Sequence, residues 1–203
     1  MEENSSCRSR FGIFGGTFDP PHVAHVRMAK AIRDLACLER VLWIPTARSP
    51  HKLDGTIAPA STRLRMVGRA ISGLEGHEVS DIEIRRGGYS YTIDTLRALK
   101  RGYPEKDLVL IMGSDQFCEL SDWHEVENLI ELVEICVLPR KSAIVPPPNI
   151  PFQERIKWML APVQESGVSS SEIRERIQQG LSFDHLVCES VGKIIREEGL
   201  YQN

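Results

Sequence analysis

The chain has 203 residues, of which 41% are hydrophobic, and its formal net charge at pH 7 is −3. This length and composition suffice to bury a hydrophobic core, which excludes an intrinsically disordered protein. The weak negative charge gives no overall reason to expect a nucleic acid or a membrane surface as partner, and no apolar run approaches the roughly 20 residues of a membrane span.

The N-terminal residues 1–9 are polar and contain no apolar segment, so we expect a flexible tail there rather than a signal peptide. Residues 10–203 are then expected to form a single domain. The five cysteines are odd in number and none lies in a C-x-x-C pair. This usage favours free thiols in a reducing compartment, and therefore a cytoplasmic protein.

Short apolar runs alternate with stretches of helical periodicity along the rest of the chain. Strands are expected at 10–14, 41–44, 77–84, 108–112, 135–138 and 156–160. Helices are expected at 23–36, 61–74, 91–101, 123–132, 170–179 and 187–198. Continuous apolar strands such as 108–112 are typical of parallel sheets that are buried on both faces. The alternation predicts an α/β fold: a Rossmann-like, doubly wound parallel sheet with helices on both faces and a small helical C-terminal part.

Polar motifs follow several of the expected strands. They occupy residues 15–17, 49–52, 113–115 and 169–171. In a doubly wound sheet, ligands bind at the carboxyl ends of the strands. We therefore expect these motifs to lie along one edge of the sheet and to contribute to one site.

The most informative motif is F-G-G-T-F-D-P-P-H-V-A-H at 14–25. Gly15, Gly16 and Thr17 are expected to form a turn between a strand and a helix, where free backbone N–H groups and the helix N-terminus suit a phosphate. His22 and His25 are three residues apart and share a helix face. The alternatives are a plain tight turn with structural histidines, and a metal site, for which the sequence offers no third ligand nearby.

Three other places allow both a structural and a functional interpretation. His51 and Lys52 belong either to a solvated loop or to a phosphate contact. Asp115 either accepts hydrogen bonds from ribose hydroxyls or caps a helix. Trp123, which lies between polar residues, either stacks on a planar ring or packs half-buried.

The serine run near the C-terminus also has two compatible interpretations. Ser169 and Glu172 have the S-x-x-E spacing of a capping box at a helix start. The same hydroxyl and N–H groups, with Arg174 one turn further on, would form an anion site.

The motif at 14–25, together with S-S-S-E-I-R at 169–174, resembles the nucleotidyltransferase superfamily, whose members carry H-x-G-H and I-S-S-T-x-x-R motifs. Within it, the bacterial nicotinate-mononucleotide adenylyltransferases are similar in further segments, in the same order, at 44–45, 49–52, 90–92, 111–115, 123–124 and 199–201. The chain departs from the pattern at Ala24, where the first motif has glycine. Milder departures are Val168 and Ser171, where isoleucine and threonine are commonest.

The resemblance implies that the chain transfers the adenylyl group of ATP to nicotinate mononucleotide, giving deamido-NAD and pyrophosphate in NAD biosynthesis. The attacking phosphate is already ionised at neutral pH, so the protein has to align the reactants and neutralise the leaving group. The residues expected to neutralise it are His22, His25, Lys52 and Arg174. The resemblance places ATP at Gly15, Gly16, Thr17, Phe18, Gly113, Asp115, Ser169 and Ser170. It places nicotinate mononucleotide at His51, Tyr91, Thr92, Trp123 and His124.

The expected partners are ATP and nicotinate mononucleotide, and the chain is expected to act as a monomer or a homodimer. Mg²⁺ is expected to arrive with ATP, held by phosphates and water rather than by a protein metal site. One alternative is a sister enzyme that accepts nicotinamide mononucleotide or phosphopantetheine. The other is a catalytically weakened nucleotide-binding homologue, which the departure at Ala24 indicates.

Overall fold

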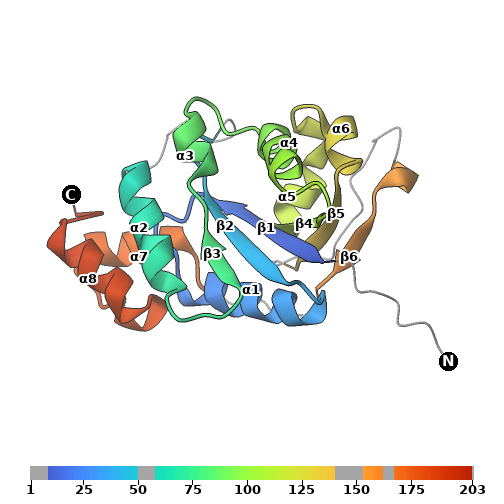
Figure 1. Ribbon diagram of the computed structural model, residues 1–203. Coiled ribbons are helices and arrows are strands. Elements are labelled where there is room, and N and C mark those ends of the chain that lie inside the picture. Colours follow the sequence, from blue (N-terminus) through green and yellow to red (C-terminus); the bar gives the residue numbers. More distant parts are fainter. Residues whose placement is uncertain (1–8, 50–57, 140–152, 162–166, 203) are drawn as a thin grey trace.

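The computed structural model of the protein describes residues 9–49, 58–139, 153–161 and 167–202. In this part of the chain, six parallel strands form a sheet with the order β3-β2-β1-β4-β5-β6 (Figure 1). They are β1 (Arg10–Gly16), β2 (Arg40–Pro45), β3 (His77–Val79), β4 (Asp107–Gly113), β5 (Val133–Leu138) and β6 (Trp158–Leu160). This order confirms the expected Rossmann-like, doubly wound α/β fold.

Helices connect the strands and cover both faces of the sheet. The α-helices are α1 (Val23–Leu35), α2 (Ala60–Ala70), α3 (Ile82–Arg86), α4 (Thr92–Gly102), α5 (Ser114–Cys118), α6 (Val126–Ile130), α7 (Ser170–Gln178) and α8 (Glu189–Glu197). The short 3-10 helices are η1 (Leu120–Asp122), η2 (Gln153–Arg155) and η3 (Asp184–Leu186). Figure 1 shows α1 on one side of the sheet and α4, α5 and α6 on the other.

Two hydrophobic clusters, one on each face, follow from the alternation of side chains along the strands. Phe11 and Ile13 of β1 belong to the cluster that contains residues of α4, α5 and α6. Phe14 belongs to the opposite cluster, with residues of α1 and with Trp43 of β2. Because both faces are covered, the strands are apolar on both sides and form continuous apolar runs in the sequence.

A third cluster joins the C-terminal helices to α2. It contains Met66 of α2, Ile173 of α7, and Val191 and Ile195 of α8. The helical C-terminal part that the sequence predicts is therefore held by apolar contacts of its own.

The chain changes direction across the sheet between β1 and β4, which lie side by side. Strands β2 and β3 extend beyond β1, whereas β5 and β6 extend beyond β4. In doubly wound folds, ligands bind in the crevice at the carboxyl ends of the strands at this switch point. Gly15 and Gly16 end β1 and Gly113 ends β4, so these three sequence-predicted site residues lie there.

The two glycines are part of β1, and the turn predicted at 15–17 is wrong in this respect. Gly15 and Gly16 pair with the last two residues of β2. The carbonyl of Gly16 also accepts a hydrogen bond from the N–H of Thr46 at 2.9 Å. This pairing depends on a neighbouring strand, which a local glycine pattern does not reveal. The turn begins only at Thr17.

The strand predicted at 77–84 is also only half right. β3 ends at Val79, and the following residues form the short helix α3. The neighbouring strand β2 ends at Pro45, which has no backbone N–H and cannot extend the ladder. The chain therefore leaves the sheet, although its apolar alternation continues.

Two further predictions change at their edges. The helix predicted at 123–132 begins only at Val126 in α6, because Glu125 before it has a left-handed backbone with φ 50°. Ser9, predicted to be in the tail, accepts a hydrogen bond at its carbonyl from the N–H of Asp107 at 3.2 Å. Residues 1–8 of the predicted tail lie outside the described residues.

Candidate active site

His22 and His25 form a stacked pair at the start of α1. His22 is the N-cap residue, and His25 is the third residue of the helix. Their ring centroids lie 3.7 Å apart with an interplanar angle of 26°. The backbone N–H of His22 donates to Nδ1 of His25 at 3.3 Å. A neutral His25 that accepts at Nδ1 carries its proton on Nε2.

The aromatic rings of Phe14 and Phe18 contact the ring of His25. The ring of Phe18 lies 5.2 Å from that of His25, and the ring of Phe14 lies 6.0 Å from it. Phe18 is only 3% exposed, so its ring supports the histidine and presents little surface to a ligand. Gly16 makes room for this ring, because a Cβ there would lie 3.1 Å from a ring carbon of Phe18. A Cβ at Gly15 would meet no atom within 4 Å.

The loop between β1 and α1 is held by a buried carboxylate. Asp19 is 6% exposed, and its Oδ1 accepts hydrogen bonds from the hydroxyl of Tyr201 at 2.7 Å and from the N–H of Ala58 at 3.2 Å. Burial, followed by the charge of Asp19, raises the pKa of Tyr201. The tyrosine therefore stays protonated and keeps donating. Asp19 was not among the sequence-predicted site residues, although it lies inside the most informative motif.

The same loop receives the start of α7. Nη1 of Arg174 donates to the carbonyl oxygen of Asp19 at 2.8 Å, and Oγ of Ser170 donates to the carbonyl oxygen of Pro20 at 2.8 Å. These two carbonyls belong to the residues three and two positions before His22. The structure thus brings Arg174 and Ser170 to the loop that leads to the histidine pair, through contacts between residues 150 or more positions apart in the sequence.

Ser169 caps α7, as the S-x-x-E spacing predicts. Its Oγ accepts a hydrogen bond from the N–H of Glu172 at 3.1 Å. Arg174 also donates to Oγ of Ser171 at 3.2 Å, so hydroxyl and guanidinium groups gather at this helix start. The capping interpretation is confirmed, and it leaves the anion-site interpretation in place.

A buried arginine that the sequence analysis missed lies beneath the site. Arg63 of α2 donates from Nη1 to the carbonyl of Thr17 at 2.7 Å, from Nη2 to the carbonyl of Thr46 at 2.7 Å, and from Nε to the carbonyl of Ala58 at 3.1 Å. Burial lowers its pKa, and the charge of Asp19 opposes that shift. Its guanidinium ties the loops after β1 and β2 together. The available signal was its helical spacing from Met66 and Val67, which places it on the buried face of α2.

The alanine that departs from the H-x-G-H pattern does not narrow the cleft. Ala24 is 1% exposed and lies in the hydrophobic cluster between α1 and the sheet. Its methyl group is therefore inaccessible to a ligand that approaches the histidines from solvent.

The end of β4 presents a second part of the site. Gly113 ends the strand and is the N-cap residue of α5. Asp115 is exposed in the first turn of that helix, so the structure assigns the cap position to Gly113 and not to Asp115.

The predicted mononucleotide residues come from two elements that meet. Tyr91 is the N-cap residue of α4, and its ring centroid lies 4.5 Å from that of His124, which precedes α6. Thr92 opens α4, and Trp123 is partly buried against the cluster on that face of the sheet. The structure thus supports packing for Trp123, while part of its ring stays exposed.

Ser90, just before Tyr91, anchors this region to the loop after β2. Its Oγ accepts from the N–H of Ala47 at 3.0 Å, and its own N–H donates to the carbonyl of Arg48 at 2.9 Å. The buried carboxyl of Glu83 accepts from the hydroxyl of Thr95 at 2.8 Å. Burial raises the pKa of Glu83, and hydrogen bonds from Ser90 and Thr95 oppose the rise. The start of α4 is therefore fixed by polar contacts on two sides.

Two predicted site residues, His51 and Lys52, lie outside the described residues. Among the residues that are described, no group of three or more His, Cys, Asp or Glu side chains is arranged to hold a metal ion. None of the described helices is both long and apolar enough to cross a membrane.

Comparison with known proteins gives concordant matches. A family model described as cytidylyltransferase-like matches residues 13–176. The chain is 39% identical over 191 residues to a probable nicotinate-nucleotide adenylyltransferase of Salinibacter ruber, covering 94% of this chain and 97% of that protein. It is 41% identical over 196 residues to a probable nicotinate-nucleotide adenylyltransferase of Dehalococcoides mccartyi, covering 94% and 96%.

Solved structures share the fold. The nicotinic acid mononucleotide adenylyltransferase of Plasmodium falciparum, complexed with NaAD, superimposes with a TM-score of 0.78 at 19% identity. The superposition covers 95% of this chain and 97% of that one. At this identity the likeness concerns the fold alone.

Replacing Tyr201 by phenylalanine should lower the free energy of unfolding by about 1–3 kcal/mol, because the buried carboxylate of Asp19 loses a hydrogen bond. Urea unfolding followed by circular dichroism measures the loss. Tyr103→Phe is the matched control: Tyr103 is 37% exposed, and its replacement should change the free energy by no more than about 0.5 kcal/mol. A Tyr201→Phe protein as stable as the control would show that this bond does not hold the C-terminal part to the loop.

Proposed function

Since the chain belongs to the cytidylyltransferase-like family, and to the nicotinate-nucleotide adenylyltransferases within it, we propose that it transfers the adenylyl group of ATP to nicotinate mononucleotide. The products are deamido-NAD and pyrophosphate, and the reaction is a step of NAD biosynthesis. The observation that carries the proposal is the contact of α7 with the loop before α1. Through it, Arg174 of α7 is held against the loop that leads into the histidine pair at the start of α1.

The chemistry asks for alignment and charge neutralisation. A phosphate oxygen of the mononucleotide attacks the α-phosphorus of ATP and forms a new P–O bond. The bond from the α-phosphorus to the bridging oxygen breaks, and pyrophosphate leaves with the electron pair. The attacking oxygen is already ionised at neutral pH, so no protein base has to remove a proton.

The residues at the start of α1 and α7 are suited to bind ATP, the substrate that donates the adenylyl group. His22 and His25 supply N–H donors and Arg174 supplies positive charge for the phosphates, and the N-terminus of α1 adds its backbone N–H groups. We assign Lys52 to the same group. Preorganised donors of this kind act most strongly on charge that develops during the reaction, here on the leaving pyrophosphate. Magnesium enters with ATP as part of the substrate and is held by phosphate oxygens and water.

The nucleotide and the acceptor occupy opposite parts of the crevice. Gly15, Gly16, Thr17, Phe18, Ser169 and Ser170 are assigned to the ATP phosphates and their surroundings, and Gly113 and Asp115 to the adenosine ribose. Phe18 acts in this set through its backbone and by supporting His25. The nicotinate ring lies between Tyr91 and Trp123, and N–H groups near Thr92 and His124 face its carboxylate, which favours the acid over the amide. We assign His51 to this acceptor part.

Ala24 no longer favours the catalytically weakened alternative. Its methyl group is buried beneath the helix surface, so ATP can approach the histidines as it would past a glycine. We further propose that residues 10–203 act as one domain and that the enzyme works in the cytoplasm. The described cysteines Cys37, Cys118, Cys136 and Cys188 are in no disulfide, which is typical of a reducing compartment.

The purified protein should form deamido-NAD from ATP and nicotinate mononucleotide faster than it uses any other acceptor. The test measures pyrophosphate release with nicotinate mononucleotide, nicotinamide mononucleotide and phosphopantetheine, each with ATP and with CTP. Faster turnover of the amide would assign the chain to the nicotinamide enzymes. Turnover of phosphopantetheine or of CTP alone would assign it to a sister enzyme.

His22→Ala and His25→Ala should each lower kcat/KM by at least about 100-fold, because each change removes an N–H donor to the phosphates. The fold should survive, since both rings lie at one helix end. His185→Ala is the matched control, because His185 is exposed in η3 and is not among the residues assigned to the site. Wild-type rates in both active-site variants would remove the proposed mechanism.

Replacing Trp123 by alanine should raise KM for nicotinate mononucleotide far more than KM for ATP, because the ring is assigned to the acceptor. Steady-state kinetics with each substrate varied in turn measures the difference. Trp158→Ala serves as control, since Trp158 lies on the edge strand β6 and contacts Phe117. An equal rise of both KM values would assign Trp123 to packing alone.

A further inference from the structure

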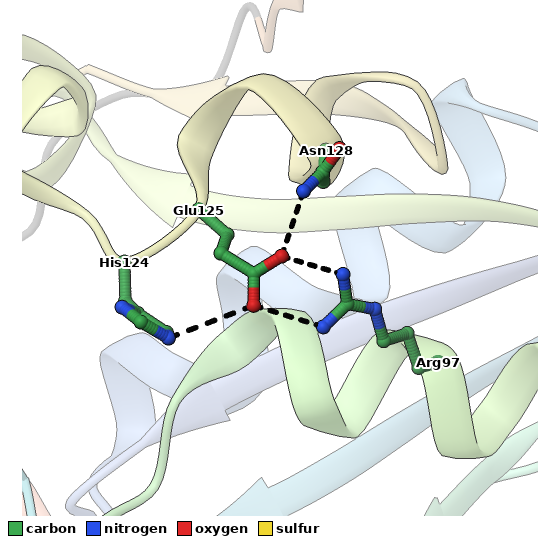
Figure 2. Close-up of polar contacts among 4 residues, drawn as sticks. All are labelled: Arg97, His124, Glu125 and Asn128. Atoms are coloured by element: carbon green, nitrogen blue, oxygen red, sulfur yellow. Dashed lines mark hydrogen bonds and ion pairs between the residues drawn. The ribbon is translucent and has the colours of Figure 1, made fainter.

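An ion pair joins the two elements that form the proposed acceptor pocket. Nη1 of Arg97 in α4 donates to Oε1 of Glu125 at 3.0 Å, and Nη2 donates to Oε2 at 2.6 Å (Figure 2). The two parallel hydrogen bonds give the pair a defined orientation as well as charge attraction. Nδ2 of Asn128 donates to Oε2 at 2.7 Å, so α6 contributes a third bond to the same carboxylate.

A small change in the backbone angles of Glu125 would move the two pocket residues that precede it. Glu125 follows Trp123 and His124 directly and is the N-cap residue of α6. Its backbone is left-handed, with φ 50° and ψ 42°, a conformation that a glutamate adopts at an energetic cost. The side-chain bonds to Arg97 offset this cost, and they set the direction in which His124 leaves the helix start.

The residue on the opposite side of the pocket, Tyr91, belongs to the start of α4, the helix that contains Arg97. Tyr91 caps α4, and its ring lies 4.5 Å from that of His124. Figure 2 shows the carboxylate of Glu125 between the imidazole of His124 and the guanidinium of Arg97, and Nε2 of His124 lies 3.6 Å from Oε1. The carboxylate thus contacts both the wall formed by His124 and the helix that carries Tyr91.

The pair is ionised throughout the pH range in which enzymes work. Hydrogen bonds from Arg97 and then from Asn128 lower the pKa of Glu125 to about 2. Both side chains are partly exposed, at 39% and 33%, and surface pairs of this kind contribute little to global stability. Its effect is therefore expected on local geometry and not on the unfolding temperature.

We propose that Arg97 and Glu125 are positioning residues that set the affinity for nicotinate mononucleotide by holding the segment with Trp123 and His124 against the start of α4. The inference rests on the proposed function, because it concerns the acceptor of that reaction. Neither residue touches the substrate. Their loss leaves the donor side at α1 and α7 intact, so ATP binding and the chemical step are unaffected.

The test is a double-mutant cycle of Arg97→Gln, Glu125→Gln and the double variant. Each single change should raise KM for nicotinate mononucleotide about tenfold, within the range of coupling found for residues that share a network. KM for ATP and kcat should each stay within about twofold. The double variant should be no worse than either single one, because the pair acts as a unit.

A matched control uses an ion pair of similar length and exposure outside the pocket. Arg40 and Glu78 join β2 and β3 at 2.7 Å, with side chains 33% and 51% exposed. Glu78→Gln should leave both KM values unchanged. Arg97→Lys keeps the charge but forms no parallel pair of bonds, so it should give an intermediate rise, and it covers the case in which a glutamine variant does not fold.

Distinct outcomes separate this inference from the proposed function. If the wild type uses nicotinate mononucleotide but its KM is unchanged in folded Glu125→Gln, the positioning role is overturned and the function stands. Equal rises in both KM values, or additive effects in the double variant, overturn it as well. A wild type that does not use nicotinate mononucleotide overturns the proposed function, and with it this inference.

Discussion

The buried carboxylate of Asp19 is the constraint on which the arrangement of the site depends. A carboxylate removed from water needs hydrogen-bond donors, because an unpaired buried charge is strongly unfavourable. Asp19 finds them in Tyr201, which is 182 residues away along the chain, and in the N–H of Ala58. Meeting that need brings the C-terminal end of the chain to the loop before α1. In the same region Nη1 of Arg174 donates to the carbonyl oxygen of Asp19, so its guanidinium lies against the loop that leads to His22.

A second buried charge complements the first. The guanidinium of Arg63 donates to carbonyl oxygens in the loops that follow β1 and β2, and so joins these two loops. The chain thus places two arginines, Arg63 and Arg174, against the loops beside the crevice although its net charge is −3. Local placement of donors, and not overall charge, decides whether a cleft suits an anion. The rings of Phe14 and Phe18 contact the imidazole of His25, and these contacts fix its orientation before a ligand binds.

The proposed acceptor pocket is held by apolar packing and by an exposed ion pair. Tyr91 and Trp123 come from segments that meet only because α4 and α6 pack on the same face of the sheet. Apolar packing brings these helices together, and Trp123 itself packs against the cluster between them and the sheet. The bidentate pair of Arg97 and Glu125 adds a defined orientation. The buried carboxylate of Asp19 thus joins distant parts of the chain. The exposed pair of Arg97 and Glu125 joins α4 to the residue that precedes α6.

The sequence by itself determined the features that repeat within one element or one motif. The helix α1 and the buried strands were predictable because apolar periodicity is local, and the cap at Ser169 follows from spacing alone. The motifs also predicted that the polar segments share one edge, since parallel strands carry their carboxyl ends together. Tertiary structure alone decided that the glycines pair with β2, that Arg63 binds the carbonyls of Thr17 and Thr46, and that Asp19 meets Tyr201. These contacts join residues far apart in the chain, and a local pattern carries no record of the partner that satisfies a buried charge or extends a strand.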